Sequence, residues 1–256
     1  MEPDFETLQT RPVEGAIARI LINKPEKLNA LDTQVLSELC EAFALYDRDP
    51  DVRIIVLSGS GEKSFIAGAD IEEMAGMGPL EFRAYTMKLR TLARVMTHTE
   101  KIVIGVVKGF AFGGGNILAM NCDFVFATEG SLFGQQEIDL GIIGGIPRLI
   151  YLVGARRAWD IVMTGRKVSA REAEEIGLIT RCLPTEGFDE FVMDYARKLL
   201  KKSRIASKMA KALKGMSEKI DLESAYEYEN ELISLCFASA DTKERLRSFA
   251  EKGRKR

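Results

Sequence analysis

Runs of apolar residues that recur along the chain predict buried strands alternating with helices. Residues 15–23 alternate between apolar and polar positions, like a strand with one buried face. Residues 52–61 and 101–109 are apolar runs typical of strands covered on both faces, and residues 122–128 predict a further short strand. Between the first two strands, apolar residues recur at helical spacing over residues 35–43. This alternation predicts an α/β fold.

Predicted helix starts carry side chains that can accept hydrogen bonds from the first free backbone N–H groups. Asp70 is followed three residues later by Glu73, which is the spacing of a capping box. Ser169 and Glu172 repeat this spacing. Further helix starts are predicted at Asp32 or Thr33, Ser203, Asp221 and Asp241.

From about Asp189 onward the pattern is helical and charged, with no strand signal between the helices. We therefore predict a core domain over residues 1–190 and a C-terminal helical region over residues 191–256. No low-complexity linker separates them, so we expect the helical region to pack on the core or on another subunit. The basic end, residues 254–256, is predicted to be a solvated tail.

Composition and charge are those of an ordinary soluble globular protein. The 256 residues are 46% hydrophobic and carry a net charge of −2, so no overall field favours nucleic acid or an anionic membrane. No apolar run approaches the roughly 18 residues of a membrane span. The N-terminal residues are acidic and polar where a signal peptide would be basic and then apolar. We therefore expect a cytoplasmic protein without nucleic-acid or membrane partners.

Scarce histidine and scattered cysteine exclude several kinds of site. The four cysteines are far apart and form no C-x-x-C pair, so no structural metal site is expected. His98 is the only histidine, and it lies in a polar stretch that predicts a surface loop. A nucleophile of the Ser-His-Asp kind would need His98 beside a nucleophile motif, which the chain lacks. Acid–base chemistry is therefore expected from carboxylates, lysines or tyrosines.

Three consecutive glycines lead into an apolar helical pattern at residues 109–120, GFAFGGGNILAM. Glycine allows close approach of the backbone to a ligand and positive φ angles. A helix start adds unpaired N–H donors in a partially positive field. The pattern matches neither of the phosphate-binding motifs G-x-x-x-x-G-K-[ST] and G-x-G-x-x-G, so a nucleotide phosphate is not the expected ligand. We expect either a site that binds an oxyanion or a tight turn with no catalytic role.

Six ordered motifs resemble the enoyl-CoA hydratase/isomerase family, also called the crotonase family, along nearly the whole chain. They are KPEKLNAL at residues 24–31, SFIAGADIEEM at 64–74, the glycine run, SLFGQQEIDLGI at 131–142, TGRKVSAREAEEIGLI at 164–179 and SFAEK at 248–252. The resemblance implies a spiral of ββα units and a helical C-terminal trimerisation region. It also implies an acyl-CoA thioester as the substrate, and hence no separate cofactor and no metal.

The resemblance also implies which residues bind the thioester. Backbone N–H groups of Ala67 and Gly114 resemble the family's oxyanion hole, where two fixed donors stabilise the charge of an enolate oxygen. Phe249 and Lys252 resemble residues that reach the CoA of a neighbouring subunit, which implies a homo-oligomer, a trimer or a dimer of trimers. The residues that resemble the CoA-binding positions are Lys24, Lys27, Leu28, Ala30, Ala69, Asp70 and Ile71.

The candidate catalytic carboxylate is Glu137, in FGQQE. Typical hydratases of the family carry two glutamates, and the position matching the first is Ile117, which cannot hold a proton. Asp139 would share a face with Glu137 in an extended segment but not in a helix. Asn116 completes a GGGN run also found in family members that act on ring-shaped acyl groups. Asn116, Ile117 and Asp139 are therefore candidates for the acyl pocket.

Several functions stay open on this pattern. The first is a hydratase that adds water to an unsaturated acyl-CoA, or removes it, through a thioester enolate; dienoyl and alicyclic acyl groups are candidates. The second is a single-glutamate double-bond isomerase, which needs no activated water and fits the apolar Ile117. A ring-opening acyl-CoA hydrolase and a non-catalytic acyl-CoA binder are further alternatives. The acyl group, the oligomer size and the pathway do not follow from the sequence.

Overall fold

Two β-sheets form the centre of the computed structural model, which describes residues 4–253. One sheet has six strands in the order β1-β2-β3-β5-β7-β10, and the other has four in the order β4-β6-β8-β9. The strands are β1 Leu8–Glu14, β2 Ile17–Ile22, β3 Ile54–Gly59, β4 Ser64–Ile66, β5 Ile102–Val107, β6 Phe110–Phe112, β7 Phe124–Thr128, β8 Leu132–Gly134, β9 Val168–Ser169 and β10 Arg181–Leu183. The four strands predicted from the sequence are confirmed as β2, β3, β5 and β7.

Helices follow the strands in a repeating order. The α-helices are α1 Thr33–Arg48, α2 Ile71–Ala75, α3 Pro79–His98, α4 Gly114–Met120, α5 Ile146–Val153, α6 Ala155–Thr164, α7 Ala170–Glu175, α8 Phe188–Leu200, α9 Arg204–Ser217, α10 Leu222–Ala238 and α11 Ala240–Gly253. The short 3-10 helices are η1 Pro25–Lys27 and η2 Glu137–Leu140. None of the helices within residues 4–253 has both the length and the apolar character needed to cross a membrane.

Each turn of the fold contributes one strand to each sheet before a helix. β3, β5 and β7 are parallel neighbours in the six-stranded sheet, and the strands that directly follow them, β4, β6 and β8, are parallel neighbours in the other. β3, β5 and β7 are apolar and almost wholly buried, as expected for parallel strands covered on both faces. The predicted spiral of ββα units is confirmed.

Side-chain caps begin the helices mostly where the sequence predicts them. Asp32, Asp70, Ser169, Ser203 and Asp221 each accept a hydrogen bond from a backbone N–H in the first turn. The predicted capping box is incomplete at Asp70, because Glu73 accepts from the Thr33 N–H, at 2.9 Å, and not from its own helix start.

Two local predictions are wrong. Asp241 does not cap a helix: it lies inside α11, and Ser239 Oγ accepts from the Thr242 N–H at 3.2 Å. His98 is not a loop residue but the exposed last residue of α3. Asp241 was predicted as a cap from its residue type, which the neighbouring Ser239 satisfies equally well, and His98 was predicted as a loop residue because the residues around it are polar.

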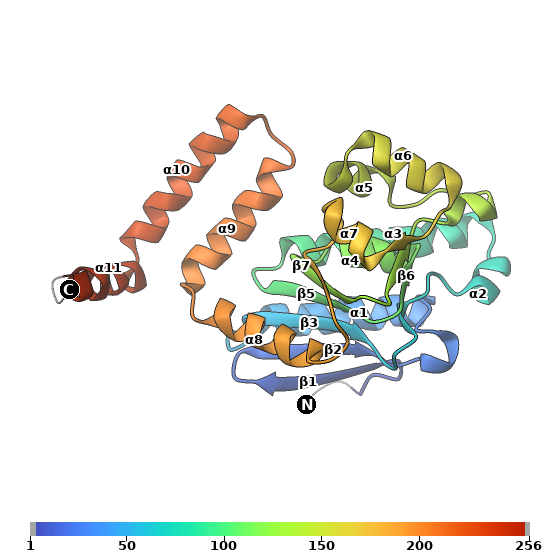
Figure 1. The fold of residues 1–256 in the computed structure, drawn as a ribbon, viewed down its shortest axis with the longest axis horizontal. Coiled ribbons are helices and arrows are strands. Elements are labelled where there is room, and N and C mark those ends of the chain that lie inside the picture. Colours follow the sequence, from blue (N-terminus) through green and yellow to red (C-terminus); the bar gives the residue numbers. More distant parts are fainter. Residues whose placement is uncertain (1–3, 254–256) are drawn as a thin grey trace.

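Of the C-terminal helices, α8 lies on the six-stranded sheet, whereas α9, α10 and α11 lie outside the sheets (Figure 1). α8 packs on the six-stranded sheet, where Phe126 of β7 meets the rings of Phe191 and Tyr195 edge to face. α9, α10 and α11 extend away from the sheets as an arm (Figure 1). The predicted boundary between residues 190 and 191 falls inside α8, and the domain division stays a prediction. Residues 254–256, predicted to be a solvated tail, lie outside the described residues.

A buried ion pair fastens the base of the arm to the core. Lys211 of α9 donates to Asp123 Oδ2 at 2.6 Å and to the carbonyl oxygens of Lys101 at 2.6 Å and Met96 at 3.1 Å. Both side chains of the pair are nearly inaccessible to solvent. Lys214 also reaches Asp123, at 3.3 Å, but its side chain is half exposed.

We expect the Lys211→Met substitution to lower the free energy of unfolding by about 3 kcal/mol, because it leaves the Asp123 carboxylate buried without its main partner. The matched variant Lys214→Met removes an exposed contact to the same carboxylate and should cost about 0.5 kcal/mol. Urea unfolding followed by circular dichroism measures both. Equal costs for the two variants would contradict the proposed anchoring role of Lys211.

Candidate active site

A cavity of about 670 Å³ lies where four segments of the spiral meet. Its walls come from the loop after β4, from α3, from the start of α4, and from η2 with the glycine-containing loop that follows it. The lining is mainly apolar, with few polar side chains, which is typical of small-molecule sites. The cavity includes Ala67, Ala69, Gly114, Ile117 and Glu137, so the fold brings together the candidate residues of three separate motifs.

The carboxyl group of Glu137 is enclosed by backbone on two sides. A Cβ atom on Gly144 would lie 2.4 Å from Glu137 Oε1, and one on Gly113 would lie 3.4 Å from the same atom. Only glycine at residue 144 leaves room for the carboxyl in this position. Oε1 accepts a hydrogen bond from Gln135 Nε2 at 3.1 Å. Oε2 is buried and has no hydrogen-bond partner among residues 4–253.

Burial raises the pKa of Glu137 above its ordinary value of 4.5, because the charged form loses hydration. Hydrogen bonds from the backbone N–H of Glu137 itself and from Gln135 act in the opposite direction and lower the pKa. A carboxyl group with a raised pKa exchanges protons more readily near neutral pH. Glu137 therefore has the environment of a general acid or base.

The other ionisable groups of the cavity are less suited to proton transfer. The Tyr85 hydroxyl donates to the Leu31 carbonyl oxygen at 2.9 Å, and burial raises the pKa of Tyr85 far above neutrality. Asp139 lines the cavity but is exposed, and η2 turns it to a different side from Glu137. Its carboxyl lies against Gly165, where a Cβ would be 2.7 Å from Asp139 Oδ2. Of the two alternatives left open for Asp139, the helical one holds.

Ile117 occupies the cavity wall one turn into α4 and also packs on the hydrophobic core. It presents only methyl and methylene groups to the space beside Glu137, and a Cβ on Gly145 would come within 2.9 Å of Ile117 Cγ1. Asn116, predicted to line the acyl pocket, instead points away from the cavity: it is buried and donates to Gln135 Oε1 at 2.8 Å. Within the part of the chain that the structure describes, the cavity thus has one carboxyl group with a buried oxygen, that of Glu137.

Two backbone N–H groups remain available near the glycine run, but one differs from the prediction. Gly114 is the first residue of α4, so its N–H has no acceptor within the helix, and no other described residue accepts from it. The Ala67 N–H is not free, because it donates to the Leu28 carbonyl oxygen at 3.1 Å. The prediction of Ala67 as an oxyanion donor is therefore wrong.

Ala69 provides the free N–H of this loop. Leu31 donates to the Gly68 carbonyl oxygen and accepts from the Asp70 N–H, both at 2.8 Å, so Ala69 between them directs its own N–H away from Leu31. Within the described residues this N–H has no acceptor. β4, which leads into this segment, pairs with β6, which leads to Gly114. The donors of Ala69 and Gly114 therefore border the same cavity.

The turn at residues 24–31 is held in place by Asn29, for which the sequence predicted no role. Its side chain is fully buried, donates to the carbonyl oxygens of Ser60 and Ser64, and accepts from the Lys24 N–H. Leu28 and Asn29 both adopt left-handed backbone conformations, with φ of 53° and 58°. The amide hydrogen bonds offset the cost of this conformation. Leu28 and Ala30 are half-buried in this turn.

The charged candidates for CoA binding are already paired with carboxylates. Lys24 pairs with Asp32, and Lys27 pairs with Asp70 at 2.9 Å and with Glu72 at 3.4 Å. The hydrogen bond from Lys27 and those from the first N–H groups of α2 keep the pKa of Asp70 below its usual range. Asp70 is thus a helix cap and an ion-pair partner. Of the predicted CoA-binding residues, Ala69 and the half-exposed Ile71 line the cavity.

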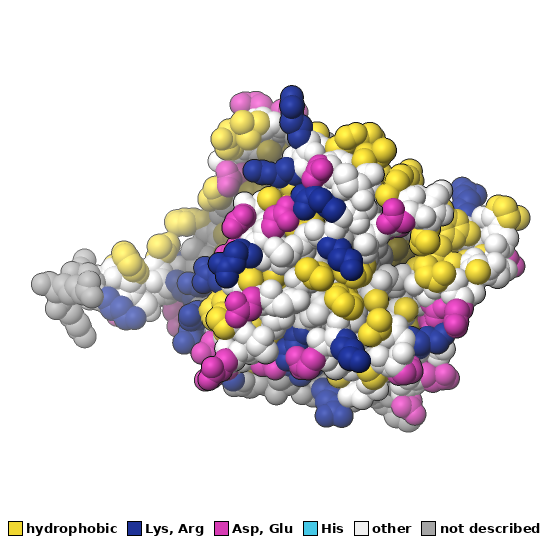
Figure 2. Space-filling model, turned by 45° about the vertical axis from the view of Figure 1, so that its right-hand side comes forward, with side chains coloured by type: hydrophobic (Ala, Val, Ile, Leu, Met, Phe, Trp, Pro, Cys, Tyr) yellow, Lys and Arg dark blue, Asp and Glu magenta, His cyan; other side chains and the backbone are white. Residues whose placement is uncertain are grey.

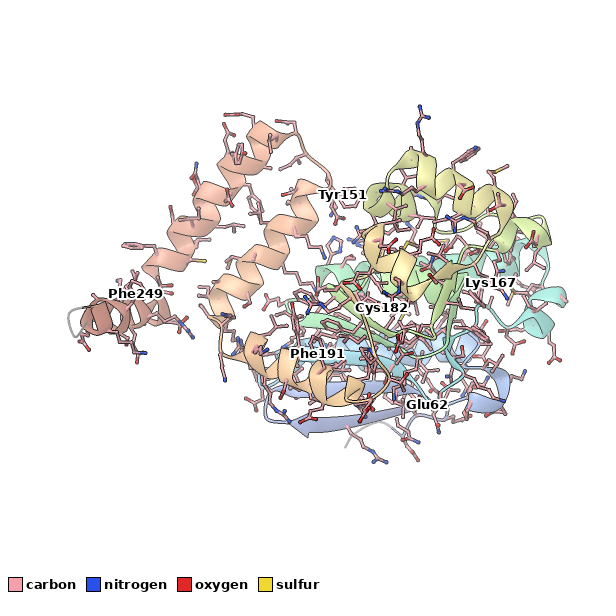
Figure 3. The ribbon with its side chains drawn as sticks, in the orientation of Figure 1. Glu62, Tyr151, Lys167, Cys182, Phe191 and Phe249 are labelled. Atoms are coloured by element: carbon pink, nitrogen blue, oxygen red, sulfur yellow. The ribbon has the colours of Figure 1, made fainter. Side chains whose placement is uncertain are left out.

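Phe249 and Lys252 lie on α11, at the far end of the arm (Figure 3). Phe249 is 80% exposed and Lys252 is also exposed, and neither lies at the cavity. Within one chain the structure does not bring them to the site.

Sequence reasoning missed the roles of Gln135 and Gly144. Gln135 lies inside the motif that marks Glu137, and its place two residues before the carboxylate was the available signal. Gly144 belongs to a glycine pair in the loop after η2. The sequence does not show why a side chain is excluded there, because the reason is the contact with Glu137 in the folded chain.

Comparison with known proteins agrees with this architecture. A family model described as enoyl-CoA hydratase/isomerase matches residues 13–256. A short-chain-enoyl-CoA hydratase of Clostridium acetobutylicum is 36% identical, and a crotonyl-CoA hydratase of Syntrophomonas wolfei is 37% identical; each alignment covers 93% of both chains. The crystal structure of an enoyl-CoA hydratase from Bacillus anthracis superposes with a TM-score of 0.93 at 31% identity, over 96% of this chain and 97% of that one.

Proposed function

Since the chain belongs to the enoyl-CoA hydratase/isomerase family, we propose that it adds water to the double bond of an unsaturated acyl-CoA, or removes it in the reverse direction. The observation that carries this proposal is the enclosed Glu137 carboxyl in the same cavity as two free backbone N–H donors. A thioester substrate needs both an oxyanion site and a proton carrier in reach of its α- and β-carbons.

In the mechanism that we propose, the thioester oxygen accepts from the N–H groups of Ala69 and Gly114. The Glu137 carboxylate takes one proton from a water molecule as the water oxygen bonds to the β-carbon. The electrons of the double bond move onto the thioester, whose enolate oxygen the two donors stabilise. Glu137 then returns the proton to the α-carbon, so that one carboxyl group serves as base and as acid.

We further propose that the acyl group is dienoyl or alicyclic. Two features support this choice: the GGGN run at residues 113–116, which resembles that of relatives acting on ring-shaped acyl groups, and the largely apolar cavity of about 670 Å³. The second candidate function is double-bond isomerisation, which the apolar Ile117 side chain favours because that reaction needs no second group to hold water.

Incubation with straight-chain, branched, dienoyl and cyclic unsaturated acyl-CoAs, followed by product mass, tests these proposals. We expect a gain of one water, with the highest kcat/KM for a dienoyl or cyclic substrate. Unchanged mass with a moved double bond would instead establish the isomerase. Unchanged substrate in every case, with tight binding of the CoA esters, would establish a binder.

The arm supports a further proposal, that the chain forms a homo-oligomer of three or six copies. Large apolar side chains are exposed along the two last helices, and some of them can be followed on the projecting arm in Figure 2. They are Leu222, Tyr226, Ile233, Leu235, Phe237, Leu246 and Phe249. Water-exposed apolar surface of this extent is typical of protein interfaces.

Light scattering should give three or six times the 28.5 kDa of one chain. The Phe249→Asp variant should shift the distribution toward smaller species, because it places a charge in the proposed interface. The variant Glu244→Ala, on the same helix, serves as the control. A monomeric parent protein at micromolar concentration would contradict the proposal.

A further inference from the structure

A chain of buried amide groups leads from α4 to the candidate catalytic carboxyl. Asn116 Nδ2 donates to Gln135 Oε1 at 2.8 Å, and Gln135 Nε2 donates to Glu137 Oε1 at 3.1 Å. Asn116 and Gln135 are each only 1% exposed. Neither lines the cavity, so neither is placed to touch a substrate.

The donor from Asn116 and the carboxylate of Glu137, which only accepts, together fix the direction of these hydrogen bonds; Asn116 Oδ1 is buried and has no partner among the described residues. A glutamine amide has one carbonyl acceptor and one NH₂ donor group, and it can turn to exchange them. Because Asn116 donates to the Gln135 carbonyl oxygen, the NH₂ group of Gln135 faces Glu137. Without that donor the Gln135 carbonyl oxygen would be buried without a partner, which destabilises the amide in the position from which it donates to the carboxylate.

The surrounding backbone leaves these side chains little room to move. A Cβ on Gly145 would lie 2.4 Å from Gln135 Nε2, and Gly145 has a φ of 64°, so no side chain fits there without displacing the amide. Gly144 stands equally close to Glu137 Oε1. The loop after η2 therefore closes over both ends of the Gln135–Glu137 hydrogen bond.

We propose that Asn116 is a positioning residue that, through Gln135, holds Glu137 Oε1 as a hydrogen-bond acceptor and leaves Oε2 as the oxygen that carries the transferred proton. The inference rests on the proposed function, because it concerns the same carboxyl group. A proton binds more readily to the oxygen that does not already accept a hydrogen bond, and Oε2 has no partner among the described residues. The hydrogen bond to Oε1 also limits the increase of the Glu137 pKa caused by burial.

Other charged groups around the carboxyl are few. The remaining ionisable side chains that line the cavity are Asp139 from η2 and Tyr85 and Arg90 from α3. No ionisable side chain of the cavity wall comes from α4, from the loop at residues 141–145 or from α6, the helix that packs on η2. Asp139 and Arg90 are exposed, and Tyr85 stays neutral. Gln135 is thus the side chain that donates to the carboxyl.

The test measures the pKa of Glu137 directly, by NMR titration of protein labelled with ¹³C at the glutamate carboxyl carbons. Glu137→Gln assigns the resonance. The variants are Asn116→Leu and Gln135→Met, which keep the volume of each side chain and remove its hydrogen bonds, and the double variant. Asn121→Leu is the control, because Asn121 donates to the Ile117 carbonyl oxygen from the other end of α4, at 2.7 Å.

We expect Gln135→Met to raise the pKa of Glu137 by about one unit, and Asn116→Leu to raise it by a smaller amount, with the control unchanged. kcat should fall about tenfold in both variants while KM stays within about twofold, because the substrate contacts are intact. The double variant should lose no more than Gln135→Met alone, since both residues act through one hydrogen bond.

An unshifted pKa and an unchanged kcat in Asn116→Leu would overturn the proposal, as would losses that add in the double variant. Should Asn116→Leu fail to fold, Asn116→Ser, whose hydroxyl is too short to reach Gln135, carries the same expectations. The NMR result does not depend on turnover. A shifted pKa without any hydration activity would therefore refute the proposed function alone, whereas hydration without a shift would refute the role of Asn116 alone.

Discussion

The Glu137→Gln variant should lose about a thousandfold in kcat while its affinity for CoA esters stays within about threefold of the parent. The substitution keeps the shape of the side chain, and the new carbonyl oxygen can still accept from Gln135. It removes the proton-carrying group of a cavity in which no other buried carboxyl was found among residues 4–253. Loss of the enoyl thioester absorbance measures kcat, and calorimetric titration with a CoA ester measures binding.

Asp139→Asn is the matched comparison for this variant, because it neutralises a second carboxyl of the same cavity. Asp139 is exposed and turned to a different side of η2, so we expect a loss below about tenfold. If Glu137→Gln kept more than a tenth of the parent kcat, proton transfer by Glu137 would be excluded. A larger loss in Asp139→Asn than in Glu137→Gln would transfer the catalytic role to Asp139.

The Gly114→Pro variant should lose about a hundredfold to a thousandfold in kcat, because proline has no N–H to donate to the enolate oxygen. Proline is well tolerated at the first position of a helix, where the N–H lacks an intrahelical partner. The preceding residue, Gly113, has φ of 50° and ψ of −117°, which is the mirror image of an extended conformation. Extended conformations are compatible with a following proline, and glycine has no Cβ to make the mirror image different. The variant should therefore fold, with a melting temperature close to that of the parent.

Gly114→Ala is the control, since it adds the same Cβ and keeps the N–H. That Cβ would lie 2.9 Å from Leu31 Cδ1, the end of a flexible side chain, so we expect a loss below about tenfold. The ratio of the two variants isolates the contribution of the N–H group. Equal losses in the two variants would show that the space at residue 114 matters and the N–H group does not.

Patterns within short stretches of the chain were enough to predict much of the fold. The apolar runs of β3 and β5 were recognisable because a parallel strand covered on both faces needs apolar residues at nearly every position. The caps Asp32 and Asp70 were recognisable because their partners lie two or three residues away. The same locality made Asp241 an error, because Ser239 satisfies the same need.

The composition of the site followed from its motifs. Glu137 in FGQQE and Ile117 after the triple glycine indicated one carboxyl group where a typical hydratase has two, and the structure places both at one cavity. What motif position could not predict was the partner of each polar group. Ala67 and Ala69 lie in the same motif, yet the approach of Leu28 and Leu31 leaves only the Ala69 N–H free.

The spatial relations of the site belong to the tertiary structure. Asn116 and Gln135 meet because α4 and the segment after β8 pack side by side, and Gly144 must lack a side chain because Glu137 lies against it. Helix and strand preferences act over a few residues, so apolar periodicity and capping residues record them in the sequence. Hydrogen-bond partners and close contacts between distant segments depend on how those segments pack, and only the folded chain specifies that packing.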